Sequence, residues 1–353
     1  MRSLLKPAAG LVLATALSCT GCSSDTPPPQ SAPSAPSAPK TPSQSPSQSP
    51  SPSQSPPATS LPGPAYAPYV SATAASDNES AGSPSAYNLA FVIAGRGGCT
   101  PTWGDKAIGD SAVKSRISAL ASSGSSMRVS FGGASGKELA TTCDNASKLA
   151  KAYATALDAA GAKEADFDIE AAALADSKSV AVRSKAIALL QKERPEVRVS
   201  FTLPVMPHGL NAKSLAVLES ANDNGVQVST VNIMTMNYGS SFDDDMGTYA
   251  IAAAKATHKQ LQGVFDLSSE DAWKGLALTS MIGVNDVDNE TFTLSDAAQV
   301  RSFAEEKGVA WVSMWAAARD TACARGKSSA KGPRTDCSGI RQSSGAFAEA
   351  FSG

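Results

Sequence analysis

Histidine and tryptophan are scarce in this chain of 353 residues, and its net charge is small. Its two histidines, His208 and His258, stand apart from the cysteines, so the sequence offers no His/Cys cluster of the kind that binds zinc. Acidic and basic residues nearly cancel to a net charge of −2, which leaves no basic footprint for nucleic acid. We therefore expect neither a metal site nor a nucleic-acid partner.

The first 22 residues have the organisation of a bacterial export signal. Arg2 and Lys6 precede a short apolar run, Gly10 to Leu17, and small residues follow it. The run is too short to span a bilayer as a permanent helix. Thr20 to Cys22 resembles a lipobox, in which Cys22 would be acylated. We expect a lipoprotein on the extracellular face of the cell membrane, with free secretion as the alternative.

Residues 23–64 consist mainly of Pro, Ser, Gln and Thr and contain almost no apolar side chains. Such a segment cannot bury enough surface to offset the entropy of ordering, so the composition predicts an extended, solvated linker. The folded part is then residues 65–353, which is long enough for one substantial core.

Four cysteines fall in the folded part: Cys99, Cys143, Cys323 and Cys337. No CxxC motif occurs among them, and an even number in an exported domain predicts two disulfides. The sequence permits three pairings. Proximity favours Cys323–Cys337, which closes a short loop and leaves Cys99–Cys143 as the second bond.

Short apolar runs separated by helical patterns predict eight strands in the folded part. The helical patterns include Ala181 to Glu193 and Thr248 to Gln262, whereas the connection after the first run is weakly helical at best. The eight runs are Tyr66 to Val70, Tyr87 to Ala94, Met127 to Phe131, Ala165 to Glu170, Val197 to Pro204, Val228 to Met236, Leu276 to Gly283 and Val309 to Trp315.

Strands that alternate with helices predict a parallel sheet in an α/β fold. Eight such units in a domain of this length fit a closed (β/α)8 TIM barrel. An open doubly wound sheet is the alternative. No G-x-G-x-x-G motif follows the first strand and the sequence contains no P-loop, which counts against that alternative.

The stretch ADFDIE carries acids at alternate positions, Asp166, Asp168 and Glu170. Alternate residues of a strand point to one side, so these three carboxylates would share a face. In an open sheet that face would be the solvated side of an edge strand. In a barrel both faces are buried, so Phe167 and Ile169 would pack on the helices and the acids would line the interior. Glu170 would lie nearest to the C-terminal mouth, where such barrels have their active sites.

Four short motifs occur in order along the predicted strands: SFGG at Ser130 to Gly133, DFDIE at Asp166 to Glu170, MNY at Met236 to Tyr238, and MW ending at Trp315. Together they resemble glycoside hydrolase family 18, which contains chitinases and endo-N-acetylglucosaminidases. Two positions depart from the family pattern. Lys163 stands where the family has the first Asp of its acidic motif, and Gly239 stands where many members have Asp.

The resemblance implies a catalytic role for each of four residues. Glu170 would be the general acid, and the 2-acetamido oxygen of the substrate would act as the nucleophile. Asp168 would orient the acetamido group, Asp166 would share a proton with Asp168, and Tyr238 would donate its hydroxyl to the acetamido carbonyl. Carboxylates this close cannot all ionise easily, so at least one pKa should be raised.

The same motifs supply the candidate substrate-binding residues. Trp315 would form an apolar platform for the sugar, Ser130 would be a hydrogen-bonding liner, and the two glycines would allow close approach of neighbouring groups. The full set is Asn237, Met236, Trp315, Ser130, Gly132 and Gly133.

Hydrolysis of β-1,4 bonds in chitin, with retention of configuration, is the predicted activity. Residues 284–308 leave no room for the α+β insertion that many family members have between strands seven and eight, so we expect an open groove. An endo-β-N-acetylglucosaminidase acting on N-glycan cores stays open as an alternative. A non-catalytic chitin-binding lectin is a second alternative, which the presence of Glu170 disfavours. We expect a monomer that needs no cofactor.

Overall fold

A computed structural model describes residues 63–324 and 332–353. The expected signal, including Cys22, and nearly all of the expected linker lie outside these residues. Within the described part, no helix combines the length and the apolarity that a membrane crossing needs.

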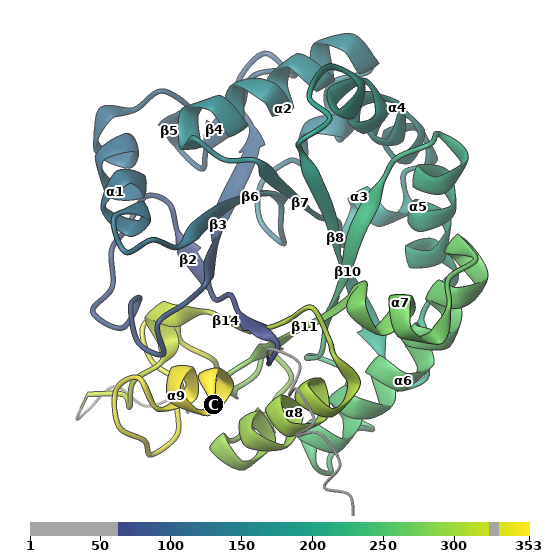
Figure 1. The fold of residues 1–353 in the computed structure, drawn as a ribbon. Helices are drawn as coiled ribbons and strands as arrows, with labels where there is room; N and C mark the ends of the chain where they lie inside the picture. The colour runs from purple at the N-terminus through teal and green to yellow at the C-terminus, as the bar shows by residue number, and fades with distance from the viewer. Residues whose placement is uncertain (1–62, 325–331) are drawn as a thin grey trace, which may run out of the picture. The chain divides into compact units, whose positions relative to one another are not determined.

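Seven parallel strands follow one another in the sheet in the same order as in the chain (Figure 1). The strands are β3 (Ala86–Ala94), β6 (Ser126–Gly132), β7 (Glu164–Asp168), β8 (Arg198–Met206), β10 (Val228–Met234), β11 (Leu276–Met281) and β14 (Trp311–Trp315).

The first predicted strand is divided in the structure into β1 (Ala65–Tyr66) and β2 (Tyr69–Ser71). β1 pairs in parallel with β14, whereas β2 pairs in parallel with β3. The division falls at Ala67 and Pro68, because proline has no N–H to donate and the chain changes partner there. The strands surround an interior in Figure 1, and the result is a TIM-barrel-like α/β fold.

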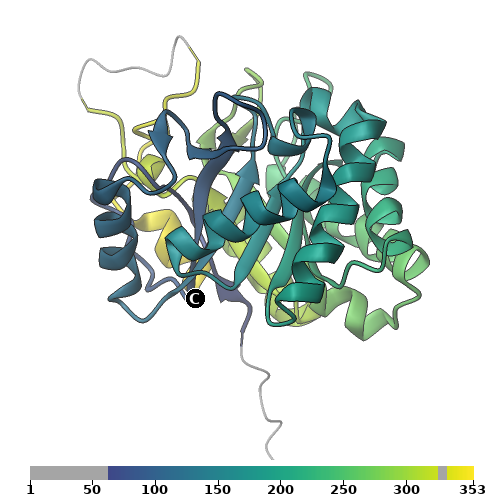
Figure 2. The same cartoon turned by 90° about the horizontal axis from the view of Figure 1, so that it is seen from above.

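Helices cover the outer side of the strands in both views (Figures 1 and 2). Helix α4 begins at Ser177, four residues before the predicted start, because the side chain of Asp176 caps its first turn. The connection between β2 and β3 contains no helix, as predicted. The helices are α1 (Ser111–Ala121), α2 (Ala146–Ala160), α3 (Ala171–Ala175), α4 (Ser177–Glu193), α5 (Ala212–Asp223), α6 (Met246–Phe265), α7 (Ser269–Lys274), α8 (Leu294–Lys307) and α9 (Ala346–Ser352), with 3-10 turns η1 (Leu139–Thr141) and η2 (Ala317–Arg319).

Five short strands form antiparallel ribbons at the ends of the main strands. β4 pairs with both β3 and β5, β9 pairs with β8, and β12 pairs with β13. Their bounds are β4 (Pro101–Trp103), β5 (Lys106–Ala107), β9 (Gly209–Leu210), β12 (Gly283–Val284) and β13 (Thr291–Phe292).

Aromatic packing between strands and helices holds β7 in place. The ring of Phe167 stacks on Phe131 of β6 at 5.2 Å and contacts Tyr153 of α2 edge-on at 5.0 Å. Phe167 and Ile169 are both fully buried. The contact with α2 confirms that Phe167 packs on the helical shell, Ile169 is buried as predicted, and the acids that alternate with these two residues face the interior.

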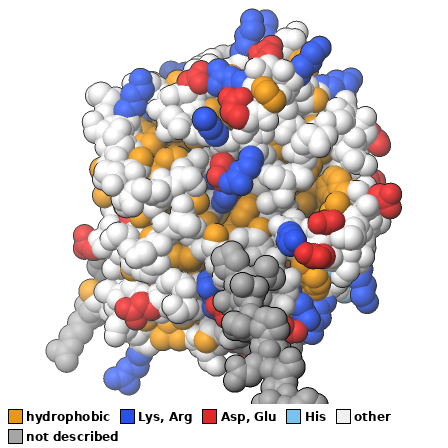
Figure 3. Space-filling model, in the orientation of Figure 1, with side chains coloured by type: hydrophobic (Ala, Val, Ile, Leu, Met, Phe, Trp, Pro, Cys, Tyr) orange, Lys and Arg blue, Asp and Glu red, His pale blue; other side chains and the backbone are white. Residues whose placement is uncertain are grey.

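Two disulfides, Cys99–Cys143 and Cys323–Cys337, are present. The pairing predicted from proximity is confirmed. Acidic and basic side chains are interspersed over the face drawn in Figure 3, in keeping with the small net charge.

Candidate active site

The three acids of the fourth predicted strand lie where alternation places them, although β7 itself ends at Asp168. Glu170 keeps an extended backbone, with φ −143° and ψ 178°, and precedes α3 as its N-cap residue. The strand therefore ends two residues before the predicted end, although the backbone N–H of Ile169 still donates to the carbonyl oxygen of Thr202 at 3.0 Å, and the predicted alternation is correct. Ala171 then adopts φ 49° and turns the chain into the helix.

Asp166 is held by hydroxyl groups on both of its carboxylate oxygens. Tyr69 Oη and Ser130 Oγ donate to Oδ2 at 3.0 and 2.6 Å, and Ser200 Oγ and Thr202 Oγ1 each donate to Oδ1 at 2.8 Å. These donors come from β2, β6 and β8. Ser130 is thus a hydrogen-bonding residue, as predicted, but it binds Asp166 beneath the pocket and does not line the pocket.

Asp168 contrasts with Asp166, because its Oδ1 atom is buried without a hydrogen-bond partner in the described part of the chain. Burial raises the pKa of Asp168 well above its usual range, and the neighbouring Glu170 and Asp166 raise it further. Hydroxyl donors occupy both oxygens of Asp166, and the proton sharing between Asp166 and Asp168 stays a prediction. Asp168 instead keeps one oxygen free beside the pocket.

A pocket of about 240 Å³ lies at the C-terminal ends of the strands, and Asp168 and Glu170 both line it. Trp315 lies in its wall, and its ring stacks on Phe91 at 5.5 Å and meets Tyr69 edge-on at 5.7 Å. The other lining residues are Ala134, Thr202, Pro204, Val205, Met206, Met234, Met236, Asn237, Thr279 and Asp286. The pocket therefore combines carboxyl groups with an aromatic and apolar wall, which suits a sugar ring.

Glu170 is partly exposed at this pocket. Burial raises its pKa above the usual value, and the negative charge of Asp286 raises it further. A carboxyl group that stays protonated at higher pH can donate a proton to a bound molecule.

Gly132 and Gly133 allow the close packing that their sequence positions predict. Both have positive φ, +106° and +83°. A Cβ atom at Gly132 would lie 2.2 Å from the carbonyl oxygen of Asp168, and one at Gly133 would lie 2.7 Å from the ring of Phe91. The glycines thus let β7 and the aromatic wall approach the loop after β6.

Tyr238 lies outside the pocket. Its ring packs against Phe242 and Tyr249, and its hydroxyl is buried without a hydrogen-bond partner in the described residues. β10 ends at Met234 and Asn237 adopts φ 55°, so the chain turns away before it reaches Tyr238. Met236 and Asn237 line the pocket in its place, and the predicted contact of Tyr238 with substrate gains no support from this position.

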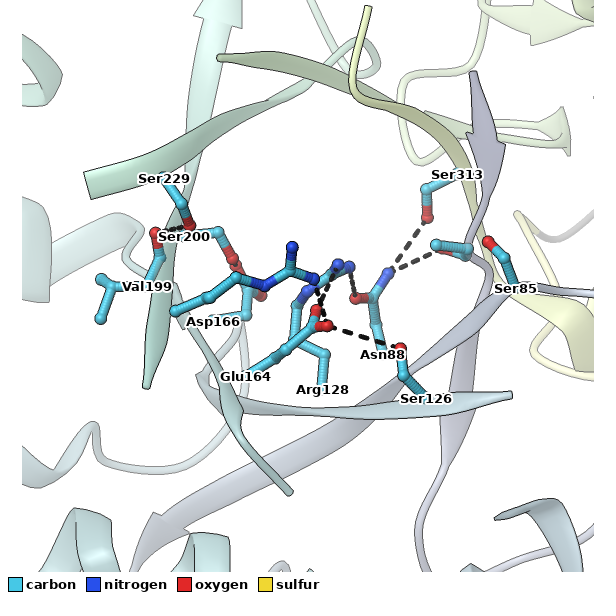
Figure 4. Close-up of polar contacts among 12 residues, drawn as sticks. Ser85, Asn88, Ser126, Arg128, Glu164, Asp166, Val199, Ser200, Ser229 and Ser313 are labelled. Atoms are coloured by element: carbon cyan, nitrogen blue, oxygen red, sulfur yellow. Dashed lines mark hydrogen bonds and ion pairs between the residues drawn. The ribbon is translucent and has the colours of Figure 1, made fainter. Parts of the chain in front are cut away.

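Glu164, at the opposite end of β7, is an inward-facing acid with cationic partners. Glu164 forms ion pairs with Arg128, at 2.7 Å, and with Arg198 (Figure 4). Burial alone would raise the pKa of Glu164, but the two arginines outweigh it and lower the pKa. Lys163, the departure from the family motif, is exposed just before β7 and does not reach the interior.

Several pocket residues were not identified from the sequence. Tyr69 and Phe91 belong to ordinary apolar runs, and Asp286 lies in a loop with no motif.

No group of three or more His, Cys, Asp or Glu side chains able to hold a metal occurs among residues 63–324 and 332–353.

Comparison with known proteins gives two curated relatives and several solved structures. The chain is 35% identical over 251 residues to a probable bifunctional chitinase/lysozyme of Escherichia coli, which covers 66% of this chain and 28% of that protein. It is 34% identical over 251 residues to endochitinase 11 of Metarhizium anisopliae, with 66% and 47% covered. The chain is similar to chitinases. It spans about a quarter and about half of the length of these two relatives, and no protein-family model matches it.

The solved structures agree with this similarity. The catalytic domain of a hyperthermophilic chitinase from Pyrococcus furiosus is 29% identical, with a TM-score of 0.72 over 82% of this chain and 94% of that one. A family GH18 chitinase from Chromobacterium violaceum is 16% identical, with a TM-score of 0.50 over 72% and 78%, and shares the fold. The structural neighbours of the chain are thus GH18 chitinases.

Proposed function

We propose that this protein hydrolyses β-1,4 bonds between N-acetylglucosamine units of chitin or chitin oligosaccharides. The observation that carries the proposal is that the end of β7 and the extended residues after it bring Asp168 and then Glu170 to a pocket lined by Trp315. Both curated relatives are named as chitinases, and one related Pyrococcus furiosus structure is described as a complex with chito-oligosaccharides. The matched 251 residues are the basis for carrying that activity to this chain.

Three pocket residues, together with Asp166 below them, have a place in the proposed reaction. Glu170, whose pKa burial raises, donates the proton to the leaving oxygen. The acetamido oxygen of the substrate attacks the anomeric carbon, and the free oxygen of Asp168 orients the acetamido N–H. Asp166, fixed by its hydroxyl donors, supports Asp168 from below. Trp315 gives the sugar an apolar face to lie on.

A comparison of substrates tests the proposal. We expect new reducing ends from soluble N-acetylated chitin oligosaccharides and no glycan release from a high-mannose glycoprotein. Release from the glycoprotein alone would instead identify an endo-β-N-acetylglucosaminidase. Binding of the oligosaccharide without any cleavage would identify a lectin. No residue of the described pocket favours either of these alternatives over the chitinase.

We further propose that the sheet closes as a (β/α)8 TIM barrel without an α+β insertion between its seventh and eighth strands. The support is that β1 pairs with β14 and β2 with β3, with only Ala67 and Pro68 between them. Between β11 and β14 the chain forms β12, β13 and α8, which is too little for a further module. A crystal structure with a gap between β14 and β3 would contradict this proposal.

We also propose that Cys22 is acylated and that residues 23–64 tether the monomeric enzyme domain to the outer face of the cell membrane. The sequence of the first 64 residues is the support. Detergent partitioning of the full chain should place it in the detergent phase, and Cys22→Ala should move it to the aqueous phase or leave the precursor unprocessed. A wild-type protein found wholly in the aqueous phase would rule out the lipid anchor.

A further inference from the structure

The pocket contains a carboxyl group that belongs to none of the family motifs. Asp286 follows β12, in the loop that leads to β13, and lines the pocket together with Glu170. These two acids come from segments more than one hundred residues apart in the sequence. No cation lines this pocket, so neither carboxylate has an ion-pair partner among the lining residues. That contrasts with Glu164, which two arginines neutralise.

Asn237 holds Asp286 in place from the other side of the pocket. Asn237 Nδ2 donates to Asp286 Oδ2 at 3.1 Å, and the backbone N–H of Asp286 donates to Asn237 Oδ1 at 2.9 Å. Two bonds of this kind fix both the loop and the direction of its carboxylate. Asn237 can face Asp286 because its backbone adopts φ 55°, a conformation that asparagine tolerates better than most residues.

A buried acid fixes the loop that carries Asn237. Glu290 is fully buried, and its Oε1 accepts the backbone N–H of Gly239 at 2.8 Å. Asn289, its neighbour, donates to the carbonyl oxygen of Phe242 at 3.0 Å. The segment around β13 is therefore joined to the segment after β10 at several points, and the position of Asp286 is set by the fold.

The charged and titratable groups around Glu170 come from several elements. Asp168 ends β7 two positions before Glu170, Asp166 lies below it, and Tyr69 of β2 donates a hydrogen bond to Asp166. Burial lowers the pKa of Arg319 of η2 and the charge of Asp286 raises it, while its guanidinium donates to the carbonyl oxygens of Ile282 and Val284. Arg319 does not line the pocket, whereas Asp286 lines it together with Glu170.

We propose that Asp286 is a positioning residue whose negative charge, fixed by Asn237, keeps the carboxyl group of Glu170 protonated and ready to act as the acid. The role goes beyond the four motifs named above and rests on the proposed function for its use in catalysis. The electrostatic effect of Asp286 on Glu170 does not depend on which substrate binds. A like charge in the same pocket disfavours ionisation of Glu170, and this charge costs little because Asp286 itself is exposed to solvent.

The titration of Glu170 tests the proposal without any substrate. The full chain is labelled with ¹³C at the glutamate side-chain carboxyl, and the Glu170 signal is assigned by its loss in Glu170→Gln. In Asp286→Asn, which keeps the shape and the hydrogen bonds to Asn237, we expect the midpoint of Glu170 to fall by about half to one pH unit at low salt. The difference should shrink in about 1 M salt, where exposed charges are screened.

Asp288→Asn is the matched control, because it removes an exposed carboxylate from the same loop outside the pocket. We expect the midpoint of Glu170 to be unchanged in this variant. The alkaline limb of kcat/KM on a chitin oligosaccharide should move down with the NMR midpoint in Asp286→Asn and stay in place in Asp288→Asn.

Two results would overturn the proposal. One is a Glu170 midpoint that is the same in Asp286→Asn and in the wild type; the other is an equal shift in the control. A lack of activity in the wild type would contradict the proposed function alone, since the NMR titration would still decide the role of Asp286.

Discussion

Glu170→Gln is expected to abolish hydrolysis of chitin oligosaccharides while leaving their binding nearly intact. Glutamine has the shape of glutamate but cannot deliver a proton to the leaving oxygen. A positioned general acid usually contributes about 10²- to 10⁴-fold to the rate, so kcat should fall by at least two orders of magnitude. Binding should survive because Trp315, Phe91 and the methionine wall of the pocket are unchanged. Rates from reducing-end release and affinities from calorimetry measure the two effects separately.

Tyr238→Phe is the matched control for this experiment, because it removes one buried hydroxyl from outside the pocket. We expect kcat within a few-fold of the wild type. A Glu170→Gln variant that keeps more than about a tenth of the wild-type kcat would reject Glu170 as the acid. A loss of two orders of magnitude in Tyr238→Phe would restore the role that its motif position implies.

The parts of the site that lie on strands could be predicted from the sequence. Successive side chains of a strand alternate between its two faces, so the acids of ADFDIE share one face. Once a barrel is assumed, Asp166 lies deepest in its interior, Asp168 lies above it and Glu170 lies nearest to the mouth. The same rule placed Phe167 and Ile169 under the helices. Alternation is a local property of an extended backbone and does not depend on distant partners. The predicted direction of Glu170 is therefore correct although this residue lies two positions beyond the end of β7.

The parts of the site that depend on turns could not be predicted in this way. Continuing β10 to Met236 would carry Tyr238 toward the mouth, but the strand ends at Met234 and Asn237 turns the chain. Nothing in the letters MNY specifies that turn. Asp286 is a second case, because its partner Asn237 is far away in the sequence and only the fold brings them together.

Hydroxyl side chains explain why Asp166 and Asp168 differ so strongly. The four donors to Asp166 come from three other strands, and only Ser130 belongs to one of the sequence motifs, whereas Tyr69, Ser200 and Thr202 belong to none. Sequence spacing alone makes the two acids equivalent. The structure separates them into one fully bonded carboxylate and one with an unpartnered oxygen, and only the second residue lines the pocket.

Substrates without an N-acetyl group should not be cleaved, even when they fit the pocket. In the proposed reaction the acetamido oxygen is the nucleophile, so a sugar with a free amine or a hydroxyl at that carbon has no attacking atom. Partly deacetylated chitin should be cut only where an N-acetylated sugar lies on the non-reducing side of the broken bond. Cello-oligosaccharides should be inert. Sequencing of the sugars that flank each cut measures this requirement.

The stereochemistry of the first product gives an independent measurement of the same mechanism. The cyclic intermediate blocks one face of the sugar, so water must enter from the original side and the released end must be the β-anomer. A thiazoline analogue of the intermediate should inhibit, because it has the shape that Asp168 and Trp315 are proposed to hold. NMR of freshly released reducing ends follows the anomer before it equilibrates. An α-anomer as the first product, or cleavage after glucosamine as often as after N-acetylglucosamine, would rule out substrate assistance, because each requires another nucleophile: an inverting water or a side chain of the protein itself.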